Sequence, residues 1–493
     1  EMSASLVGSE MCIRDSSWSD PRTGEILNAS VYLYHNLVGL VRNWRFVQTA
    51  QADTDVRRKQ LPTDILGDCI SYVVAHEVGH TFAFMHNMAA SSSIPVDSLR
   101  SASFTNKYGT TYSIMDYARN NYVAQPGDKE KGVRLTPPDL GIYDYFSVKW
   151  LYSPIMSAKS SEEEIPILRQ WISEKLPDPA YRYGRQQIRT RIDPSSFEED
   201  LGDDPVKASS YGVMNLKYIL SQMNEWIKDD VEGDFRKEIY NEIIGQYIRY
   251  INNVLFNIGG IYVNEHYEGD PFPSYVPVTK EKQRESLKFL WEQALDCSWI
   301  DEPALQKILP LHSNLSSVIE NLIIDYVLKR FPSVAICGDK MEQNPYTQLD
   351  YMDDLYYYMF MVPDKKNVLS ASEKNMQLKF VSYLMNGIKT VKKGSAAGTS
   401  GRMLTDERIP LPEGIVAPTY LYDGPLNHFN DPKEVMGFED TVSVTIPVES
   451  MEHHYYSMLR KIERLAKNRM SAGSDENRTH YRLLVYKISQ SLK

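Results

Sequence analysis

Three histidines and one glutamate stand within the otherwise apolar stretch HEVGHTFAFMHN (76–87). In H-E-x-x-H on a helix, His76 and His80 lie about 40° apart round the axis and one turn apart along it, so both imidazoles can reach one metal ion. Glu77 can hold a metal-bound water and take its proton without being a ligand. A single histidine on an apolar helix is usually a hydrogen-bonded core residue, but the full pattern arises by chance in roughly one such chain in a hundred. The spacing therefore predicts metal-assisted hydrolysis.

A third histidine can join this pair only if the chain turns sharply. In a continuous helix His86 would lie about 9 Å beyond His80 along the axis and well round the side. In the longer pattern H-E-x-x-H-x-x-G-x-x-H a glycine makes the turn, because glycine tolerates positive φ. Here the position is Ala83. A left-handed alanine costs roughly 1–2 kcal/mol, which a zinc site worth on the order of 10 kcal/mol can offset. We therefore expect a turn after Phe82.

The segment SIMDY (113–117) follows the histidine motif at a short distance. Taken alone it reads as an ordinary loop with one buried methionine. Together the two segments resemble the metzincin zinc endopeptidases, which have this extended zinc motif and a methionine turn. The resemblance implies that Met115 forms an apolar floor beneath the ligands. It also implies that Tyr117 either ligates zinc or stabilises the oxyanion.

The resemblance implies a mechanism as well as a cofactor. Zn²⁺ would be held by three histidines, with water at the open coordination position. Glu77 would act as the general base towards that water, and Tyr117 would assist at the carbonyl oxygen. The implied ligands are His76, His80 and His86.

Further sequence segments resemble those of large bacterial extracytoplasmic zinc-dependent proteases with a metzincin domain and a long helical C-terminal region. These segments are WSDPRTGEILNA, LTPPD with KWLYSPI, and EDLGDDPVKAS. The resemblance has recognisable motifs over residues 17–240. This resemblance implies a secreted, periplasmic or surface-attached protein that acts on a peptide or protein substrate.

The elements that must position this chemistry follow from periodicity and turn signals. Residues 62–84 read as a helix that is apolar on most sides and therefore buried, with Thr63 or Asp64 as its cap. Residues 24–36 read as a strand. By the resemblance this strand would be the cleft edge that pairs with an extended substrate. An interior strand is an equally good interpretation from the residues alone.

The remaining chain is predicted to be mainly helical, so the fold class is α+β. The catalytic domain would contain a partial upper sheet, the active-site helix and the Met-turn subdomain, and would occupy residues 17–155. Residues 156–493 would form a helical C-terminal region that could divide into two subdomains, with a flexible loop at 392–402.

Residues 87–135 and the acidic stretch up to about 204 read as loops. Expected elements are helices at 135–154 (capped by Thr136), 204–227, 232–260, 279–296, 302–308, 314–330 and 346–360, a strand at 440–448, and two closing helices.

The first residues of the chain do not read as part of a fold. GSEMCIRDS within residues 1–16 looks like translated sequencing-adaptor read-through, so we exclude this stretch. Residues 18–62 leave room for one strand and a connecting segment before the active-site helix, too little for a whole upper sheet. We therefore expect an N-terminally truncated fragment whose signal peptide is missing.

Composition excludes several classes of function. The net charge of −11 argues against nucleic-acid binding through a basic surface. No apolar run approaches the roughly 20 residues of a transmembrane helix. The four cysteines contain no C-x-x-C pair and are too few for a disulfide framework. The oligomeric state stays open.

Weaker candidates have plainer interpretations. SFEEDLGDDP (196–205) could bind calcium but lacks EF-hand spacing, so a solvated acidic loop leading to a helix is favoured. His453 and His454 stand side by side and point different ways on a helix, so we expect surface residues. The tyrosine-rich segment 350–361 is expected in a core or an interface.

Two alternatives to a metzincin protease stay open at this stage. A non-catalytic, zinc-stabilised binding or scaffold protein would explain Ala83, but it has no use for Glu77. A gluzincin-type site with a downstream glutamate ligand is disfavoured by the placement of His86 and by SIMDY (113–117).

Overall fold

The structure is a computed structural model, and it describes residues 13–187, 191–311, 314–366, 368–392, 409–412, 415 and 448–492 of the 493-residue chain. It has the helix-rich α+β architecture expected from the sequence. The strands are β1 Ile13–Ser19, β2 Ile26–Leu33, β3 Ile261–Val263 and β4 Tyr275–Pro277. The helices are α1 Leu37–Thr49, α2 Thr63–Thr81, α3 Ala102–Tyr108, α4 Ile142–Tyr152, α5 Ser161–Ser173, α6 Pro205–Trp226, α7 Asp234–Leu255, α8 Lys280–Leu295, α9 Pro303–Gln306, α10 Leu315–Leu328, α11 Phe331–Asp339, α12 Gln348–Tyr356, α13 Ala371–Lys392, α15 Val448–Arg469 and α16 Asp475–Ser491.

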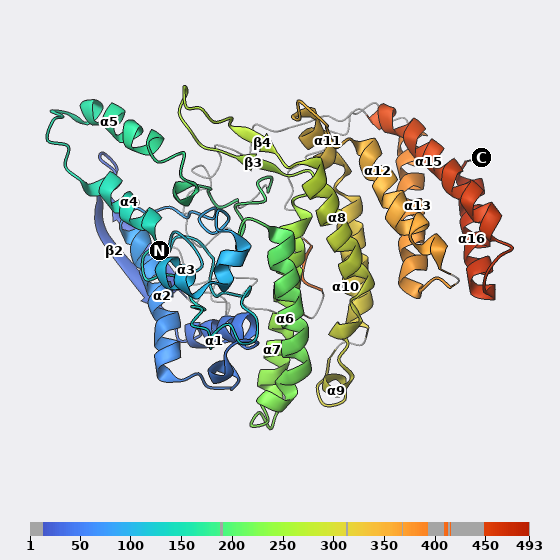
Figure 1. The fold of residues 1–493 in the computed structure, drawn as a ribbon, viewed down its shortest axis with the longest axis horizontal. Helices are drawn as coiled ribbons and strands as arrows, with labels where there is room; N and C mark the ends of the chain where they lie inside the picture. Colours follow the sequence, from blue (N-terminus) through green and yellow to red (C-terminus); the bar gives the residue numbers. More distant parts are fainter. Residues whose placement is uncertain are drawn as a thin grey trace.

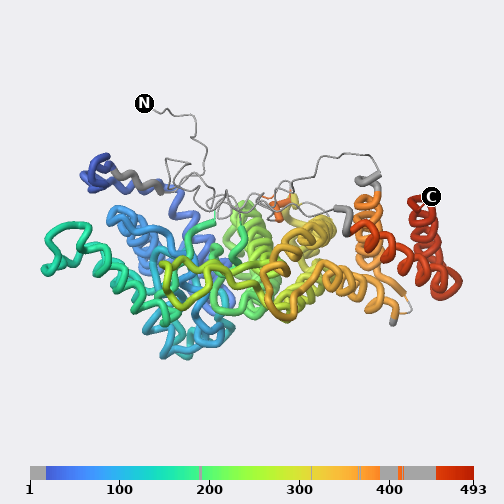
Figure 2. The backbone as a smooth tube through the Cα atoms, turned by 90° about the horizontal axis from the view of Figure 1, so that it is seen from above, coloured from blue at the N-terminus to red at the C-terminus, as the bar shows by residue number. Residues whose placement is uncertain are grey.

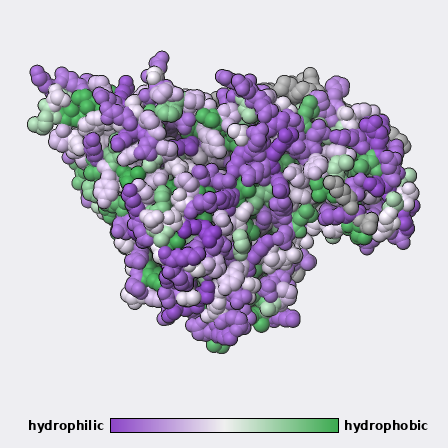
Figure 3. Space-filling view, viewed as in Figure 1, coloured by the Kyte–Doolittle hydropathy of each residue, from purple (hydrophilic) through white to green (hydrophobic). Residues whose placement is uncertain are grey.

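The elements are laid out along the long axis of the molecule in rough sequence order (Figures 1 and 2). The strands β1 and β2 stand at one end with α2. The helices α6, α7, α8 and α10 form the middle, and α13, α15 and α16 form the other end (Figure 1). On the face shown in Figure 3 hydrophilic residues predominate, and hydrophobic residues occur in separate small patches, as on an ordinary water-exposed surface. In the described part of the chain, no helix is both long and apolar enough to cross a membrane.

The N-terminal elements surround the active-site helix of the sequence prediction. β1 and β2 pair antiparallel, with Ile13 opposite Leu33, and together they are the whole of this sheet within the described residues. Val31 of β2 packs on a small apolar cluster shared by α1 and α2. This cluster fixes α2 from one side, and it contains Leu37, Leu40, Val41, Trp44, Cys69 and Val73.

Two expectations for this end were wrong. Residues Ile13 to Ser16, which the sequence analysis excluded, are part of β1. The segment between β2 and α2 is not a mere connection, because it contains the helix α1. This helix was missed although Phe46 and Val47 enter the main core.

The middle of the molecule is built on the packed pair α6 and α7. Asp204 caps α6 by accepting a hydrogen bond from the backbone N–H of Lys207 at 3.0 Å. The two helices approach closely at Gly212, where a Cβ would lie 2.5 Å from the ring of Tyr250. One continuous apolar core runs from Phe46 in α1 to Ile488 in α16.

Several boundaries differ from the sequence prediction. α4 begins at Ile142 after Gly141, so Thr136 is not its cap. The helices α3, α5, α11 and α13 were not expected. α2 is less buried than expected, because its flank towards solvent includes Val78 at 38% exposure. The strand expected at 440–448 and the loop expected at 392–402 lie almost wholly outside the described residues. The division at residue 155 stays a prediction.

Candidate metal centre

The turn after α2 is made by an alanine in a left-handed conformation. α2 ends at Thr81 with Phe82 as C-cap, and Ala83 has φ of +63°. The backbone N–H of Ala83 donates to His80 O at 2.9 Å, and that of Phe84 donates to Gly79 O at 3.1 Å. This pair of hydrogen bonds is the Schellman motif, which usually has glycine at the left-handed position. The helix therefore stops where the sequence analysis placed the turn.

The turn brings the three histidines of the motif together. Nε2 of His86 lies 3.2 Å from Nε2 of His76 and 3.2 Å from Nε2 of His80. Together they form a group of side chains close enough to hold one metal ion. Nitrogen ligands at zinc distances in tetrahedral geometry stand roughly 3.3 Å apart. The spacing of the donor set therefore fits zinc.

Backbone carbonyls fix the orientation of two of the rings. Nδ1 of His76 lies 2.7 Å from Ile114 O, and Nδ1 of His80 lies 2.8 Å from Phe84 O. A carbonyl oxygen can only accept, so each Nδ1 carries the proton and each neutral ring keeps the lone pair on Nε2. Those lone pairs converge near His86, an arrangement that a cation stabilises. Such outer hydrogen bonds are typical of histidines that bind metals.

The centre is buried on most sides and opens at one ligand. His76 is 3% exposed and His86 2%, while His80 is half-buried. Glu77, next to His76 on α2, is 1% exposed. On a helix Glu77 and His80 are three residues apart and share a face. Glu77 therefore lies on the same side of α2 as His80, next to the histidine group.

Met115 lies directly against α2 beneath this group. It is 1% exposed, and a Cβ added at Gly79 would meet its Sδ at 2.5 Å. The backbone N–H of Asn87, just after His86, donates to Met115 O at 3.1 Å. Gly79 was missed by the sequence analysis, although the glycine inside HEVGH was a signal for close approach.

Tyr117 packs on two of the histidines. Its ring centroid lies 5.2 Å from that of His76 and 4.9 Å from that of His86. The residue is 6% exposed. The structure thus brings all six residues singled out in the sequence into one region. Their roles in binding and catalysis stay predictions.

Two buried aspartates, both missed in the sequence analysis, hold the Met-turn segment. Asp144 accepts hydrogen bonds from Ser113 Oγ at 2.6 Å and from the backbone N–H groups of Ile114 and Gly141 at 2.9 and 2.6 Å. Asp116 accepts from the backbone N–H of Ser91 at 2.8 Å. Burial raises the pKa of both carboxyl groups, against the opposing effect of these hydrogen bonds. Asp144 thus holds the residue whose carbonyl orients His76.

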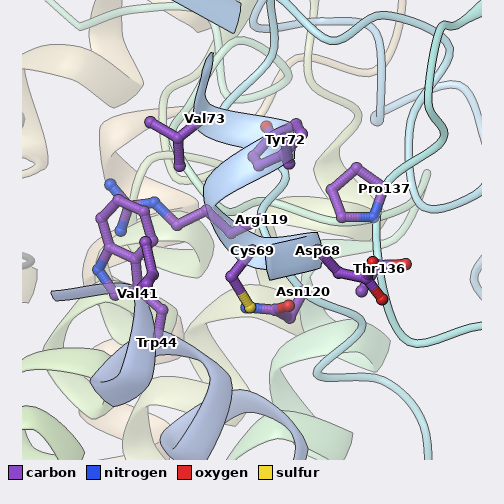
Figure 4. A pocket seen from close by; sticks show the side chains of 10 residues that line it. All are labelled: Val41, Trp44, Asp68, Cys69, Tyr72, Val73, Arg119, Asn120, Thr136 and Pro137. Carbon is purple, nitrogen blue, oxygen red and sulfur yellow. The ribbon is translucent and has the colours of Figure 1, made fainter. Parts of the chain in front are cut away.

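A small pocket lies along the same side of α2 as the histidines, about one to two helical turns before them, between α1, α2 and the segments 119–120 and 136–137 (Figure 4). It does not include the three histidines. Burial raises the pKa of the Cys69 thiol at its wall to about 11, so this cysteine is protonated and poorly nucleophilic at neutral pH. Its lining residues are Val41, Trp44, Asp68, Cys69, Tyr72, Val73, Arg119, Asn120, Thr136 and Pro137.

The acidic segment 196–205 is not the solvated loop that was expected. Glu198 is 3% exposed and Glu199 0%. Glu198 pairs with Arg191, with Nη1 at 2.6 Å from Oε2. The carboxylates of this segment pair with arginines or accept hydrogen bonds from backbone N–H groups. These contacts account for the acidic residues without a calcium ion.

The other weak candidates lie where the sequence analysis expected them. His453 is exposed and His454 half-buried on α15. The tyrosine-rich segment contributes Tyr351, Leu355 and Phe360 to the core. Neither adds a group to the metal centre.

Comparison with known proteins gives one match. The family model described as Met-zincin matches residues 58–367, well over half of the chain. The matched stretch contains the histidine group, the turn at Ala83 and the segment of Met115. Neither a curated protein nor a solved structure matches the chain.

Proposed function

Because the chain belongs to the Met-zincin family of zinc metalloproteases, we propose that it is a zinc-dependent endopeptidase acting on peptide or protein substrates. The observation that carries the proposal is the convergence of three imidazoles, two of them at 3.2 Å from His86 Nε2, beside a buried glutamate. A purely structural zinc site has no need of a carboxylate at this position, whereas hydrolysis needs a base.

The three histidines, His76, His80 and His86, would hold the metal. Zinc in such a site supplies a Lewis acid that polarises the scissile carbonyl and acidifies water. Glu77 takes a proton from the attacking water on its carboxylate and delivers it to the leaving nitrogen. Tyr117 donates its phenol proton as a hydrogen bond to the carbonyl oxygen, which gains negative charge during attack.

The site of action is part of the proposal. The resemblance over residues 17–240 supports a place outside the cytoplasm, where a protease would meet extracytoplasmic proteins. Fractionation of cells that express the full-length gene would test this, and recovery in the cytoplasmic fraction alone would contradict it.

The decisive experiment is Glu77→Gln in the whole chain, which keeps the shape of the side chain and removes the base. We expect about 10²–10⁴-fold lower kcat with one zinc retained per chain. Metal content would be measured by mass spectrometry, and cleavage with a peptide library. Glu320→Gln is the control, because Glu320 is a buried glutamate of α10 that accepts a hydrogen bond from Ser372 of α13. Both lie in the helical body, which we define as the helices from α6 to α16.

The outcomes separate the protease from a scaffold. Wild-type protein that holds zinc and cleaves no peptide in the library would overturn the proposal in favour of a zinc-stabilised binding protein. Unchanged kcat in Glu77→Gln would remove Glu77 from the mechanism.

A further inference from the structure

Two non-glycine residues in left-handed conformations form an ion pair next to the metal centre. Arg119 has φ of +49° and Glu199 has φ of +59°. They are 3% and 0% exposed, and Arg119 Nη1 donates to Glu199 Oε1. Such backbone conformations are costly for residues with side chains and persist only where surrounding contacts over-determine them. Strained residues of this kind cluster at functional sites.

Glu199 joins three parts of the molecule. Its carboxylate accepts from Gln48 Nε2 of α1 at 2.6 Å and lies 3.5 Å from Arg249 Nε of α7. Its carbonyl accepts from Asn253 Nδ2 at 3.1 Å. Its backbone N–H donates to Tyr117 O at 3.2 Å. One buried residue thus ties the helical body to the segment that carries Tyr117.

Arg119 continues the connection through aromatic rings. Its guanidinium lies 3.8 Å over the ring of Trp44 and 5.8 Å from the ring of Tyr117. Figure 4 shows the arginine reaching across the pocket to the indole of Trp44. The ring of Tyr117 in turn packs on His76 and His86. A continuous set of contacts therefore runs from Glu199 to two of the three histidines.

We propose that Glu199 is a positioning residue for the metal centre, acting through Arg119 and through the backbone of Tyr117. It holds the left-handed turn at Arg119 and thereby sets the Tyr117 ring against the histidines. The inference deepens the proposed function and rests on it for its kinetic part. The neighbouring Glu198 does not share this role, because its carboxylate pairs with Arg191 and Gln186.

This difference between neighbours supplies a matched control. Glu198→Gln and Glu199→Gln each remove the charge of a buried ion pair from the same segment. Both should lower the melting temperature. Only Glu199→Gln should release the turn that positions Tyr117, so only it should change the metal centre.

The test compares the two variants with wild type as whole chains. Zinc affinity is measured by competition with a chromophoric chelator, and the ligand field by the visible absorption of Co²⁺-loaded protein. We expect Glu199→Gln to bind zinc at least 10-fold more weakly, with altered Co²⁺ bands. We expect kcat to fall at least 10-fold while KM changes less than 3-fold, because positioning acts on the transition state. Glu198→Gln should match wild type in all three.

If Glu199→Gln does not fold, Arg119→Lys tests whether the Glu199–Arg119 pair positions the metal centre. It keeps the buried pair of charges but replaces the planar guanidinium between Trp44 and Tyr117. Altered Co²⁺ bands and lower kcat are again expected. Variants at 199 and 119 that match Glu198→Gln in metal affinity, Co²⁺ bands and kcat would overturn the inference.

Failure of the proposed function would look different. In that case wild type shows no cleavage, and the metal affinities and Co²⁺ bands still distinguish Glu199 from Glu198. A change confined to Glu199→Gln would support positioning at a non-catalytic metal site, and its absence would overturn it.

Discussion

The segment around the metal centre and the helical body are stabilised by different means. Between Phe82 and Gly141 the chain has little regular structure beyond the short α3, and many of its buried side chains are polar. In α7, by contrast, most of the buried side chains are apolar or aromatic, including Ile243, Ile244 and Ile248. The polar set near the metal centre includes Thr110, Thr111, Ser113, Asp116, Arg119, Asn120 and Asn121.

The contrast follows from the backbone. A helix satisfies its own N–H and C=O groups, so its side chains can be chosen for apolar packing. An irregular buried segment must satisfy them with side chains. Gln48 Oε1, for example, accepts from both the backbone N–H and Nδ2 of Asn120 at 3.0 Å. We therefore expect the stability of the helical body to depend mainly on the volume of its buried side chains. Zinc affinity should depend mainly on the hydrogen bonds around the metal centre.

The largest effect should come from a cavity in the body. Ile248 in α7 is 0% exposed. Ile248→Ala should lower the free energy of unfolding by about 2–5 kcal/mol through lost burial and the cavity left behind. Zinc affinity of the folded protein should be unchanged. Urea unfolding and chelator competition measure the two quantities, and Val231→Ala at a 91% exposed site is the control. If Ile248→Ala weakened zinc binding as strongly as it lowers the free energy of unfolding, the contrast between the two regions would be wrong.

Next in size is loss of the carboxylate that holds the Met-turn. Asp144→Asn replaces one acceptor oxygen by a donor amide, which cannot accept from all three of Ser113, Ile114 and Gly141. We expect zinc affinity to fall about 10–100-fold, because Ile114 O orients His76. Asp139→Asn, at a side chain that is 95% exposed, should have no effect. Chelator competition decides, and unchanged zinc affinity would show that Ile114 is held by packing alone.

Acid should destabilise the far end of the body, where a histidine is buried between α13 and α16. Burial lowers the pKa of His480 in α16 to about 4, and its Nε2 lies 2.8 Å from Gln377 Oε1 of α13. The folded-state pKa is below the unfolded value, so this stability is present above about pH 6.5 and lost as pH falls towards 4. We expect a loss of order 1 kcal/mol across this window. Hydrogen exchange of α16 at several pH values would show it. His480→Gln should flatten the dependence, and a profile unchanged by that variant would contradict the assignment.

The smallest effect should come from relieving the turn after α2. Ala83→Gly removes the penalty of a left-handed alanine but adds backbone entropy to the unfolded chain. The net gain should be about 0.5–1 kcal/mol with zinc bound, and cleavage should be preserved. Ala75→Gly inside α2 is the control and should lose about 1 kcal/mol. Thermal unfolding measures both, and equal destabilisation by the two variants would mean that Ala83 is unstrained.

The histidine group could be predicted because its geometry is local. His76 and His80 are related by helix spacing alone, and the return of His86 needs a single left-handed residue within a few positions. The long helices α6 and α7 were predictable for the same reason, since a cap at Asp204 and a repeating apolar face need only neighbouring residues. The amphipathic α5 was missed because its acidic first turn was read as loop.

The residue pattern alone predicted a metal site suited to hydrolysis, with three imidazoles, a glutamate and a methionine turn at family spacing. What holds these groups in place became visible only in the folded chain. Asp144 lies in a predicted helix and Glu199 in a segment read as loop, both far along the chain from α2, and they reach the centre through Ile114 and Tyr117. The spacing of residues on one helix follows from backbone geometry, whereas a contact between distant segments depends on how the whole core packs. Which buried polar groups then need partners is settled only when that packing is complete.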